Sequence, residues 1–327
     1  MKICKTLLIL LTLSLAACGA PIVVTLTATA VQIAKATPTL TVVASRLPSA
    51  TRPVSTATAR PSPSPAPSLT PQPTATPAHI WTLGLSAGGN PIDIYRFGQG
   101  PTTIVLIGGI HGGYEWNTIL LAYEMIDYFE QSPSEIPSGF SLYIIPAANP
   151  DGLATIIGHT GRFSAQELPA GTTAGRFNAN GVDLNRNWDC KWQKEAQWQT
   201  ETISAGSAPF SEPETRLVSD FLTSLPAAAV IWWHSAMPGV FPGGCNDRFP
   251  AALALADDYS SGSTYPVQKE FVSYHVTGDA SDWLSLQGIP SISVELSTHK
   301  DTEFKRNLAG VLSVLQAFVA RPTPSVP

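Results

Sequence analysis

The chain has 327 residues, of which 44% are hydrophobic and 13% are charged, and its formal net charge is −5. A charged fraction this low, without a long basic run, excludes the usual footprint of a nucleic-acid-binding protein. Proline is enriched in the first quarter of the chain, so we expect that quarter and the remainder to differ in structure.

Residues 1–18 are predicted to be an export signal. Two lysines near the start supply positive charge, and Thr6 to Leu15 form an apolar run that is short for a bilayer span. The run ends in Leu15-Ala16-Ala17-Cys18, which resembles the bacterial lipobox, in which the cysteine is lipidated and becomes the new N-terminus. An ordinary signal peptide that happens to contain a cysteine is the alternative. With Cys18 as the lipid anchor, we expect an exported protein on the bacterial cell envelope, with its domain on the extracytoplasmic side.

Residues 19–78 are predicted to be a disordered tether, because they consist largely of Thr, Pro, Ser and Ala and have no apolar periodicity. A proline-rich tether is semi-rigid and reaches ~3.1 Å per residue where it is polyproline-like. It would therefore hold the following domain tens of ångströms from the membrane. Residues 321–327 are predicted to be a flexible tail.

Residues 79–320 are predicted to form one α/β domain. The expected strands are a hairpin from Ile80 to Tyr95 that turns at Gly88-Gly89-Asn90, followed by Thr103–Ile107, Leu142–Ile145, Ala229–Trp233 and Ser291–Leu296. The expected helices are Thr118–Phe129, a helix from an N-cap at Ser211 to about Leu225, and Asp301–Val319. Strands that alternate with helices favour a mostly parallel sheet with helices on both faces.

Two cysteines remain in this domain once the signal is removed and Cys18 is lipidated. Cys190 and Cys245 are predicted to form a disulfide, because the exported compartment is oxidising. Each follows a segment that we assign to the functional site, so the bridge would tie two loops of that site together.

Metal-binding side chains occur at the ends of three predicted strands. His111 and Glu115 follow the first buried strand, His234 ends another, and Glu295 lies in a third. In parallel sheets, sites form at the carboxyl ends of the strands. Two imidazoles and one carboxylate are the protein ligands of a catalytic zinc site that keeps its fourth position for water. The sequence therefore predicts one Zn²⁺ per chain.

Three further patterns identify a family resemblance. The stretch from Gly181 to Asp189 contains Asp-Leu-Asn-Arg-Asn-Trp, Asn149-Pro150-Asp151-Gly152 precedes it, and a C-terminal series follows, made of Tyr274, Gly278, Asp282, Trp283 and Glu295. Over residues 80–318 the chain resembles the zinc carboxypeptidases of the carboxypeptidase A superfamily. The resemblance implies a single domain built on a twisted, mixed, mostly parallel sheet of about eight strands between helices.

The resemblance also implies roles around the metal. The zinc ligands would be His111, Glu115 and His234. Asp183 would accept a hydrogen bond from the far nitrogen of His111 and fix its tautomer. Glu295 would act as general base towards a zinc-activated water, and Arg176 would stabilise the oxyanion. Arg162 is the alternative for the oxyanion role, in which case Arg176 would be a solvated loop residue.

On the substrate side, the resemblance implies that Asn185, Arg186 and Tyr274 bind the terminal carboxylate, for which a planar guanidinium is the natural partner. Ser281 occupies the position that reads the terminal side chain. The segment Thr277-Gly278-Asp279 is like that of murein peptide amidases and γ-D-glutamyl-diaminopimelate peptidases. We therefore hypothesise that Asp279 recognises the amino group of a diamino acid in a cell-wall peptide.

The first two ligands depart from the family pattern His-x-x-Glu, because three residues separate His111 from Glu115. Gly112 and Gly113 would let the backbone bulge by one residue and still deliver the carboxylate. The alternative is that Glu115 misses the metal. A family arginine beside the glutamate is also absent, because Gly113 and Tyr114 occupy that space.

The predicted function is that of a metallocarboxypeptidase acting on peptides with a free C-terminal carboxylate, without an obligate protein partner. One rival is a deacylase of the same fold that acts on N-acyl amino acids. The other is a non-catalytic, wall-binding protein that has lost the metal. His159, His275 and His299 are interpreted as ordinary surface or structural histidines, and the Trp-rich stretch from Trp188 to Trp198 as packing.

Overall fold

The computed structural model describes residues 79–169, 174–269 and 271–321. The predicted export signal, the tether and all but the first residue of the tail lie outside the described residues. Within the described part of the chain, no helix has both the length and the apolar character needed to cross a membrane.

The described residues form a sheet of seven strands in the order β1-β2-β4-β3-β7-β9-β8. The strands are β1 (His79–Leu85), β2 (Pro91–Gly98), β3 (Thr102–Ile107), β4 (Phe140–Ile145), β7 (Ala227–Ser235), β8 (Gly239–Pro242) and β9 (Ser291–Leu296). The four central strands β4, β3, β7 and β9 are parallel, whereas β2 and β8 are antiparallel to their neighbours and β1 is antiparallel to β2. The predicted mixed, mostly parallel sheet is confirmed, with seven strands instead of about eight. A separate hairpin is formed by β5 (Glu195–Trp198) and β6 (Glu201–Ser204).

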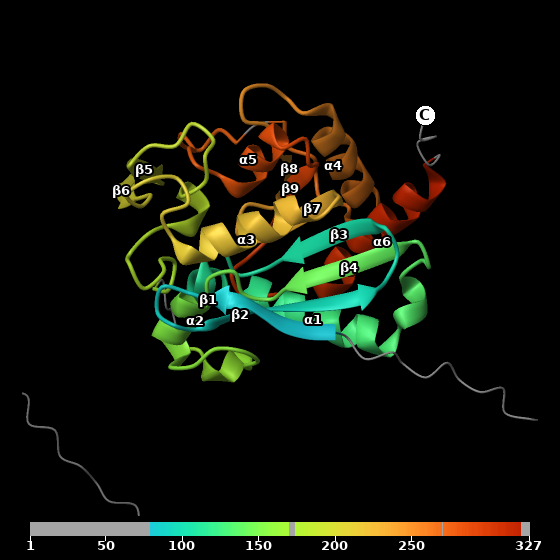
Figure 1. Ribbon diagram of the computed structural model, residues 1–327, viewed down its shortest axis with the longest axis horizontal. Coiled ribbons are helices and arrows are strands. Elements are labelled where there is room, and N and C mark those ends of the chain that lie inside the picture. The colour runs from blue at the N-terminus through green and yellow to red at the C-terminus, as the bar shows by residue number, and fades with distance from the viewer. Residues whose placement is uncertain (1–78, 170–173, 270, 322–327) are drawn as a thin grey trace, which may run out of the picture. The chain divides into compact units, whose positions relative to one another are not determined.

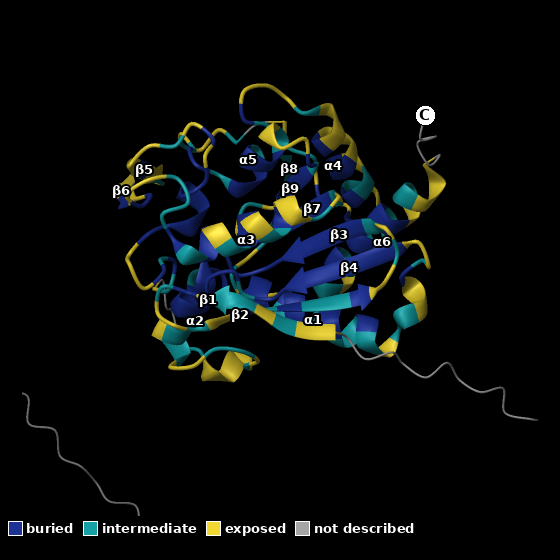
Figure 2. Cartoon of the chain, viewed as in Figure 1, coloured by how far each residue is buried: buried dark blue, intermediate teal, exposed yellow. Residues whose placement is uncertain are grey.

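Helices cover both faces of this sheet (Figure 1). They are α1 (Trp116–Gln131), α2 (Pro150–Ile157), α3 (Pro213–Ser224), α4 (Pro250–Ser263), α5 (Ala280–Leu286) and α6 (Phe304–Ala320). One core cluster joins alternate residues of β3 to α1, α4 and α6, and the other joins the remaining residues of β3 to α3 and α5. Because both faces are covered, the central strands are continuous apolar runs, which are buried in Figure 2.

The predicted elements are recovered, but all three predicted helix starts are misplaced. Helix α1 begins at Trp116, two residues before the predicted Thr118. The N-cap of α3 is Glu212 instead of Ser211, whose hydroxyl instead donates a 2.7 Å hydrogen bond to the Glu212 carboxylate. Helix α6 begins at Phe304, later than the predicted Asp301, because the Asp301 carboxylate accepts the backbone N–H of Glu303 in the preceding turn. In α3 and α6 a local side-chain bond replaces the expected helix start.

Candidate metal centre

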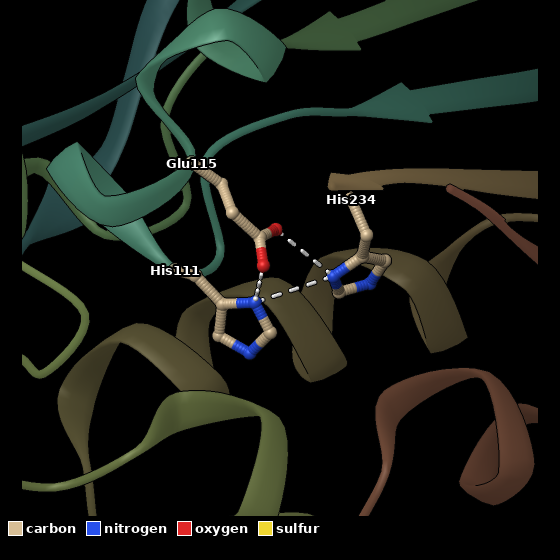
Figure 3. Close-up of side chains that lie close together, drawn as sticks. All are labelled: His111, Glu115 and His234. Carbon is tan, nitrogen blue, oxygen red and sulfur yellow. Dashed lines mark hydrogen bonds and ion pairs between the residues drawn. The ribbon is translucent and has the colours of Figure 1, made fainter. Parts of the chain in front are cut away.

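Two imidazoles and a carboxylate meet at the carboxyl ends of β3 and β7 (Figure 3). His111 follows β3, Glu115 ends the 3-10 turn Gly112–Glu115, and His234 lies in β7. A carboxylate oxygen of Glu115 lies 2.7 Å from Nδ1 of His111, and the other lies 3.3 Å from Nδ1 of His234. The three candidate ligand atoms all lie within 4.8 Å of one another. The three predicted ligands are therefore brought together.

The extra residue between His111 and Glu115 is accommodated by glycine. Gly112 has a φ of +48°, which side-chain-bearing residues rarely adopt. A Cβ atom built there would lie 2.6 Å from the carbonyl oxygen of Gly175. This turn directs the Glu115 side chain towards both imidazoles, so the alternative in which it points away is wrong.

The unmet bonding capacity of these residues fits a metal ion. The two Nδ1 atoms face each other at 3.4 Å, and among the described residues the buried Oε2 of Glu115 has no hydrogen-bond partner of good geometry. Burial alone would raise the pKa of Glu115, but the His111 and His234 rings lower it below its usual value, so the carboxyl is ionised. Two nitrogens and one carboxylate oxygen are the donor set of a zinc site with an open position.

A buried ion pair supports His111 from behind. Asp183 has no exposed surface, and one of its oxygens lies 3.6 Å from Nε2 of His111, slightly beyond hydrogen-bond range. Its other oxygen accepts a 2.8 Å hydrogen bond from Nε of Arg176, and Nη2 of the same guanidinium lies 2.8 Å from it as an ion pair. Burial would raise the pKa of Asp183, but Arg176 and His111 hold it far below its usual value. The site thus places an anion on the side of His111 that faces away from Glu115.

Of the two candidate arginines, only Arg176 lies in the site. It is 3% exposed, and its guanidinium comes within 3.9 Å of Glu115. Arg162 instead forms an exposed ion pair with Asp127.

Glu295 lies in β9 directly opposite His234 in the sheet register. One of its oxygens accepts the backbone N–H of Met237 at 3.3 Å. Burial raises the pKa of Glu295 to about 8 although the His234 ring lowers it in part. A divalent cation held by the neighbouring ligands favours the ionised carboxylate, which is the form that a general base requires.

A cavity of about 670 Å³ opens over this centre. The predicted site residues that line it are His111, His234, Glu295, Arg176, Asn185, Arg186, Tyr274, Asp279 and Ser281. Its volume suits a small ligand or the end of a peptide. His275, interpreted from the sequence as an ordinary histidine, also lines it.

The three residues expected to bind a carboxylate lie together in the cavity wall. The Arg186 guanidinium lies 5.8 Å from the centre of the Tyr274 ring and donates to the backbone carbonyl of Gln197. The Asn185 side chain donates to Asp279 at 2.8 Å and accepts the N–H of Ala280 at 3.0 Å. Asn185 therefore also fixes the start of α5 against the segment that carries Arg186.

Asp279 is the N-cap of α5, and its carboxylate accepts four hydrogen bonds within the protein. It accepts the backbone N–H groups of Ser281 and Asp282, the Ser281 hydroxyl and the Asn185 amide. Three of these bonds go to Oδ1, and the Asn185 amide bonds to Oδ2, so most of the carboxylate's acceptor capacity is used within the protein. The structure thus assigns Asp279 a structural part that the sequence did not suggest.

Asp282 is a cavity residue that sequence reasoning noted only as part of the family series. One of its oxygens accepts the N–H of Gly244 at 2.9 Å, and within the described residues it forms no ion pair with Lys or Arg. Burial, with Asp279 nearby, raises the pKa of Asp282 to about 7. The sequence signals for Asp282 were its place in that series and its position beside Ser281.

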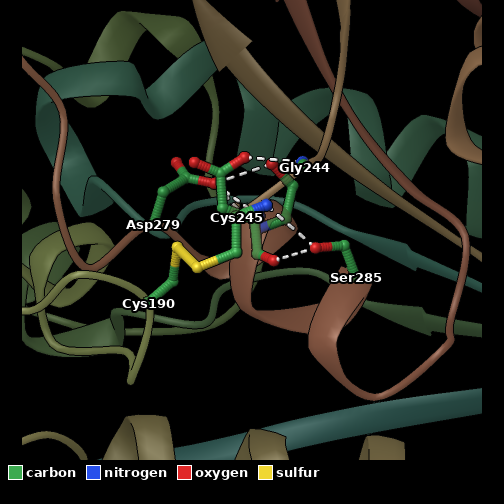
Figure 4. The surroundings of a disulfide bond; sticks show 7 residues. Cys190, Gly244, Cys245, Asp279 and Ser285 are labelled. Carbon is green, nitrogen blue, oxygen red and sulfur yellow. Dashed lines mark hydrogen bonds between the residues drawn. A yellow bond between two sulfur atoms is a disulfide. The ribbon is translucent and has the colours of Figure 1, made fainter. Parts of the chain in front are cut away.

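The predicted disulfide between Cys190 and Cys245 is present, with the two Cα atoms 5.7 Å apart (Figure 4). The N–H of Cys245 donates to the Ser285 hydroxyl, and the carbonyl of Cys190 accepts the N–H of Gly278. The bridge therefore joins two loops to the segment that contains α5.

These features define a class of α/β proteins that hold a candidate metal centre at the carboxyl ends of parallel strands, beneath a substrate-sized cavity. The family model described as zinc carboxypeptidase matches residues 74–309. The chain belongs to this family, whose members are zinc-dependent metallocarboxypeptidases.

Relatives agree with this assignment. The chain is 25% identical over 233 residues to carboxypeptidase B of Astacus astacus, a match that covers 64% of this chain and 76% of that protein. The structure of carboxypeptidase A from Helicoverpa armigera shares its fold with a TM-score of 0.57 and 19% identity, over 74% of this chain and 69% of that one. The murein-tripeptide amidase MpaA from Escherichia coli O157 shares the fold with a TM-score of 0.51 and 19% identity, over 75% and 93% of the two chains.

Proposed function

We propose that this domain hydrolyses the amide bond next to a substrate's C-terminal residue. The observation that carries the proposal is the His111–Glu115–His234 cluster, which opens into the same cavity as Glu295 and Arg186. When bound, zinc would polarise the scissile carbonyl and make a bound water nucleophilic near neutral pH.

Each of the surrounding side chains has a role that its position supports. Glu295, opposite His234, would accept the proton of the attacking water and return it to the leaving amine. Arg176 would stabilise the developing oxyanion, because its buried guanidinium lines the cavity beside the ligands. Arg186, with Asn185 and Tyr274, would hold the terminal carboxylate, to which a guanidinium can donate two hydrogen bonds.

The test combines metal analysis with one substitution. We expect about one zinc per chain and hydrolysis of peptides that have a free C-terminus, but not of the same peptides with an amidated end. A Glu295→Gln variant should keep its zinc and bind peptide while kcat falls by about 10²- to 10⁴-fold. Near-normal turnover in that variant would overturn the mechanism.

The same experiment separates the rivals. A protein that purifies without zinc, and does not take it up, supports the non-catalytic, wall-binding alternative. Hydrolysis of N-acyl amino acids in preference to peptides supports the deacylase.

We further infer that the released residue carries an amino group, as a diamino acid of a cell-wall peptide does. The support comes from Asp282, a half-buried carboxylate in the cavity wall, with Asp279 beside it. A cationic side chain would compensate the cost of burying this negative charge. Asp279 accepts four hydrogen bonds within the protein, whereas Asp282 accepts one, so Asp282 is the better direct partner for the amino group. The nearby carboxylate of Asp279 would add to the electrostatic attraction.

The measurement compares peptides that differ only in their last residue: lysine, diaminopimelate, phenylalanine or glutamate. Asp282→Asn should reduce the preference for the amino-bearing residues by about 10- to 100-fold in kcat/KM, the worth of a hydrogen bond to a charged group. Failure to act on any muropeptide, with normal action on ordinary basic peptides, would refute the cell-wall substrate alone.

We propose that the protein is exported and lipid-anchored through Cys18, on the basis of the Leu15-Ala16-Ala17-Cys18 segment. In a bacterial host, the full chain should fractionate with membranes and incorporate labelled fatty acid. A Cys18→Ala variant should do neither, and a variant that still incorporates the label would refute Cys18 as the anchor.

A further inference from the structure

Three aromatic side chains from separate segments gather beside the candidate metal centre. Tyr114 lies in the turn between His111 and Glu115, Trp198 ends β5, and His299 follows β9. The Tyr114 ring packs edge-on against Trp198 at 5.2 Å between centroids, and lies 4.8 Å from the His299 ring. We call Tyr114, Trp198 and His299 the aromatic cluster.

Arg176 joins the aromatic cluster to the catalytic cavity. Its guanidinium carbon lies 4.6 Å from the centre of the Trp198 ring and 5.7 Å from that of Tyr114, while the same side chain lines the cavity. The turn that carries Tyr114 also holds the candidate ligands, with His111 before it and Glu115 directly after it. The aromatic cluster therefore adjoins the metal end of the cavity.

The carboxylate of Asp282 has different neighbours. One of its oxygens accepts the N–H of Gly244, and Asp279, three residues earlier, accepts the side-chain amide of Asn185, which is expected to bind the terminal carboxylate. The two regions thus differ in position. Asp282 lines the cavity beside the carboxylate-binding residues, whereas the aromatic cluster contacts the cavity-lining Arg176 beside the metal ligands.

The aromatic cluster is held in place without being covered. Nδ1 of His299 lies 2.9 Å from the Ser235 hydroxyl, which donates to the Asn117 side chain, and Asn117 in turn donates to the backbone carbonyl of Thr298. All three aromatic side chains are nevertheless only partly buried. Rigid aromatic groups with one packed and one open face lose little conformational entropy on binding, which favours recognition.

We propose that the aromatic cluster is the subsite for the residue that precedes the scissile bond, and that it selects an apolar or aromatic side chain there. This inference rests on the proposed function. If the released residue occupies the cavity with its carboxylate at Arg186, the substrate chain must leave past the metal ligands and Arg176. The aromatic cluster is the surface that the chain meets there.

The test is a binding measurement that needs no turnover. Zinc-loaded Glu295→Gln protein is titrated with N-acetylated dipeptides that end in lysine and carry glycine, alanine, leucine or phenylalanine before it. We expect phenylalanine and leucine to bind roughly 4- to 12-fold more tightly than glycine, because binding would remove about half of such an apolar side chain from water.

Substitutions then locate the preference. In the same Glu295→Gln background, Trp198→Ala should reduce the preference to about 2-fold and leave the glycine peptide unchanged, whereas Trp198→Phe should retain most of it. His299→Ala, on a separate segment, should also weaken it and provides a second test if Trp198→Ala does not fold. His159→Ala is the matched control, because His159 is exposed and paired with Glu167 on another surface. Zinc content and melting temperature are measured for each variant.

The outcomes are distinguishable. Equal binding of the glycine and phenylalanine peptides, or an equal loss for all peptides in Trp198→Ala, overturns the subsite and leaves the proposed function intact. Binding that does not require a free C-terminal carboxylate overturns both.

Discussion

Replacing Asp183 by asparagine tests how the buried ion pair supports the metal centre. Asp183 is fully buried, and its carboxylate accepts a 2.8 Å hydrogen bond from Nε of Arg176 and forms a 2.8 Å ion pair with Nη2. Arg176 is itself 3% exposed. Asparagine keeps the shape but removes the charge. The Arg176 guanidinium then remains buried, with its closest other anion, Glu115, 3.9 Å away.

The expected cost follows from this burial. Removing one partner of a buried ion pair typically destabilises a protein by about 3–5 kcal/mol, because an uncompensated charge is left behind. That is a large part of a domain's usual stability of about 5–15 kcal/mol. Since Asp183 also lies behind His111, zinc affinity should fall by about 10- to 100-fold.

The assays are urea unfolding of the metal-free protein and zinc competition against a chelator of known affinity. Because the folded-state pKa of Asp183 lies below its unfolded value, its stabilisation is present above about pH 4 and is lost as the pH falls through the folded-state pKa. The difference between the variant and the wild type should therefore be full at pH 7 and shrink in acid.

The chain offers a matched control in the pair formed by Asp127 and Arg162. This pair is likewise a hydrogen-bonded carboxylate and guanidinium, with bonds of 2.7 and 3.1 Å, but both side chains are 48% exposed. Asp127→Asn should therefore cost at most about 1 kcal/mol and should leave zinc affinity unchanged. Equal, small losses in the two variants would refute the reasoning from burial, and an unchanged zinc affinity in Asp183→Asn would refute the supporting role towards His111.

Three further predictions follow from the same geometry. Gly112→Ala should weaken zinc binding, measured by competition with a chelator. The backbone at this position is left-handed, and an added Cβ would lie 2.6 Å from the Gly175 carbonyl oxygen, so the turn before Glu115 would have to move. An unchanged zinc affinity would contradict this prediction. Replacing both Cys190 and Cys245 by alanine should lower the free energy of unfolding, measured in urea, by roughly 4 kcal/mol. The bridge closes a loop with a sequence separation of 55 residues and so reduces the chain entropy of the unfolded state. A loss below about 1 kcal/mol would contradict this prediction. Asp282 has a folded-state pKa of about 7, above its unfolded value, so the wild type should lose stability between about pH 4 and 7 as the buried carboxyl ionises. Asp282→Asn should flatten that dependence in thermal melts at pH 5 and pH 8, and an unchanged slope would contradict it.

The central strands were predictable because their sequences report burial directly. A strand such as β3, covered on both faces, must be apolar at nearly every position, and this pattern stands out in the sequence. The short strand β8 and the β5–β6 hairpin were not predicted, because four-residue strands carry little periodicity. The starts of α3 and α6 were misplaced for a related reason, since side-chain bonds that form only in the folded turn decide where each helix begins.

The site was predictable where residues follow strands and not where distant segments meet. His111, His234 and Glu295 could be grouped because the carboxyl ends of neighbouring parallel strands share one edge of the sheet. No such rule connects Trp198 and His299, which lie on a peripheral hairpin and a late loop and meet only through Tyr114. The part that Asp279 plays as a helix cap was equally invisible without the start of α5.

The unusual spacing between the first two candidate ligands links these observations. A longer turn that contains two glycines keeps the Glu115 carboxylate against both imidazoles, and it also places Tyr114 where it contacts Trp198 and His299. The same turn therefore supplies a candidate zinc ligand and the centre of the aromatic cluster. If the proposed subsite is correct, shortening the turn by one residue would alter acyl-side selectivity even where zinc binding survives. Metal binding and substrate choice would thus be coupled through a single backbone segment, which includes Gly112 with its positive φ.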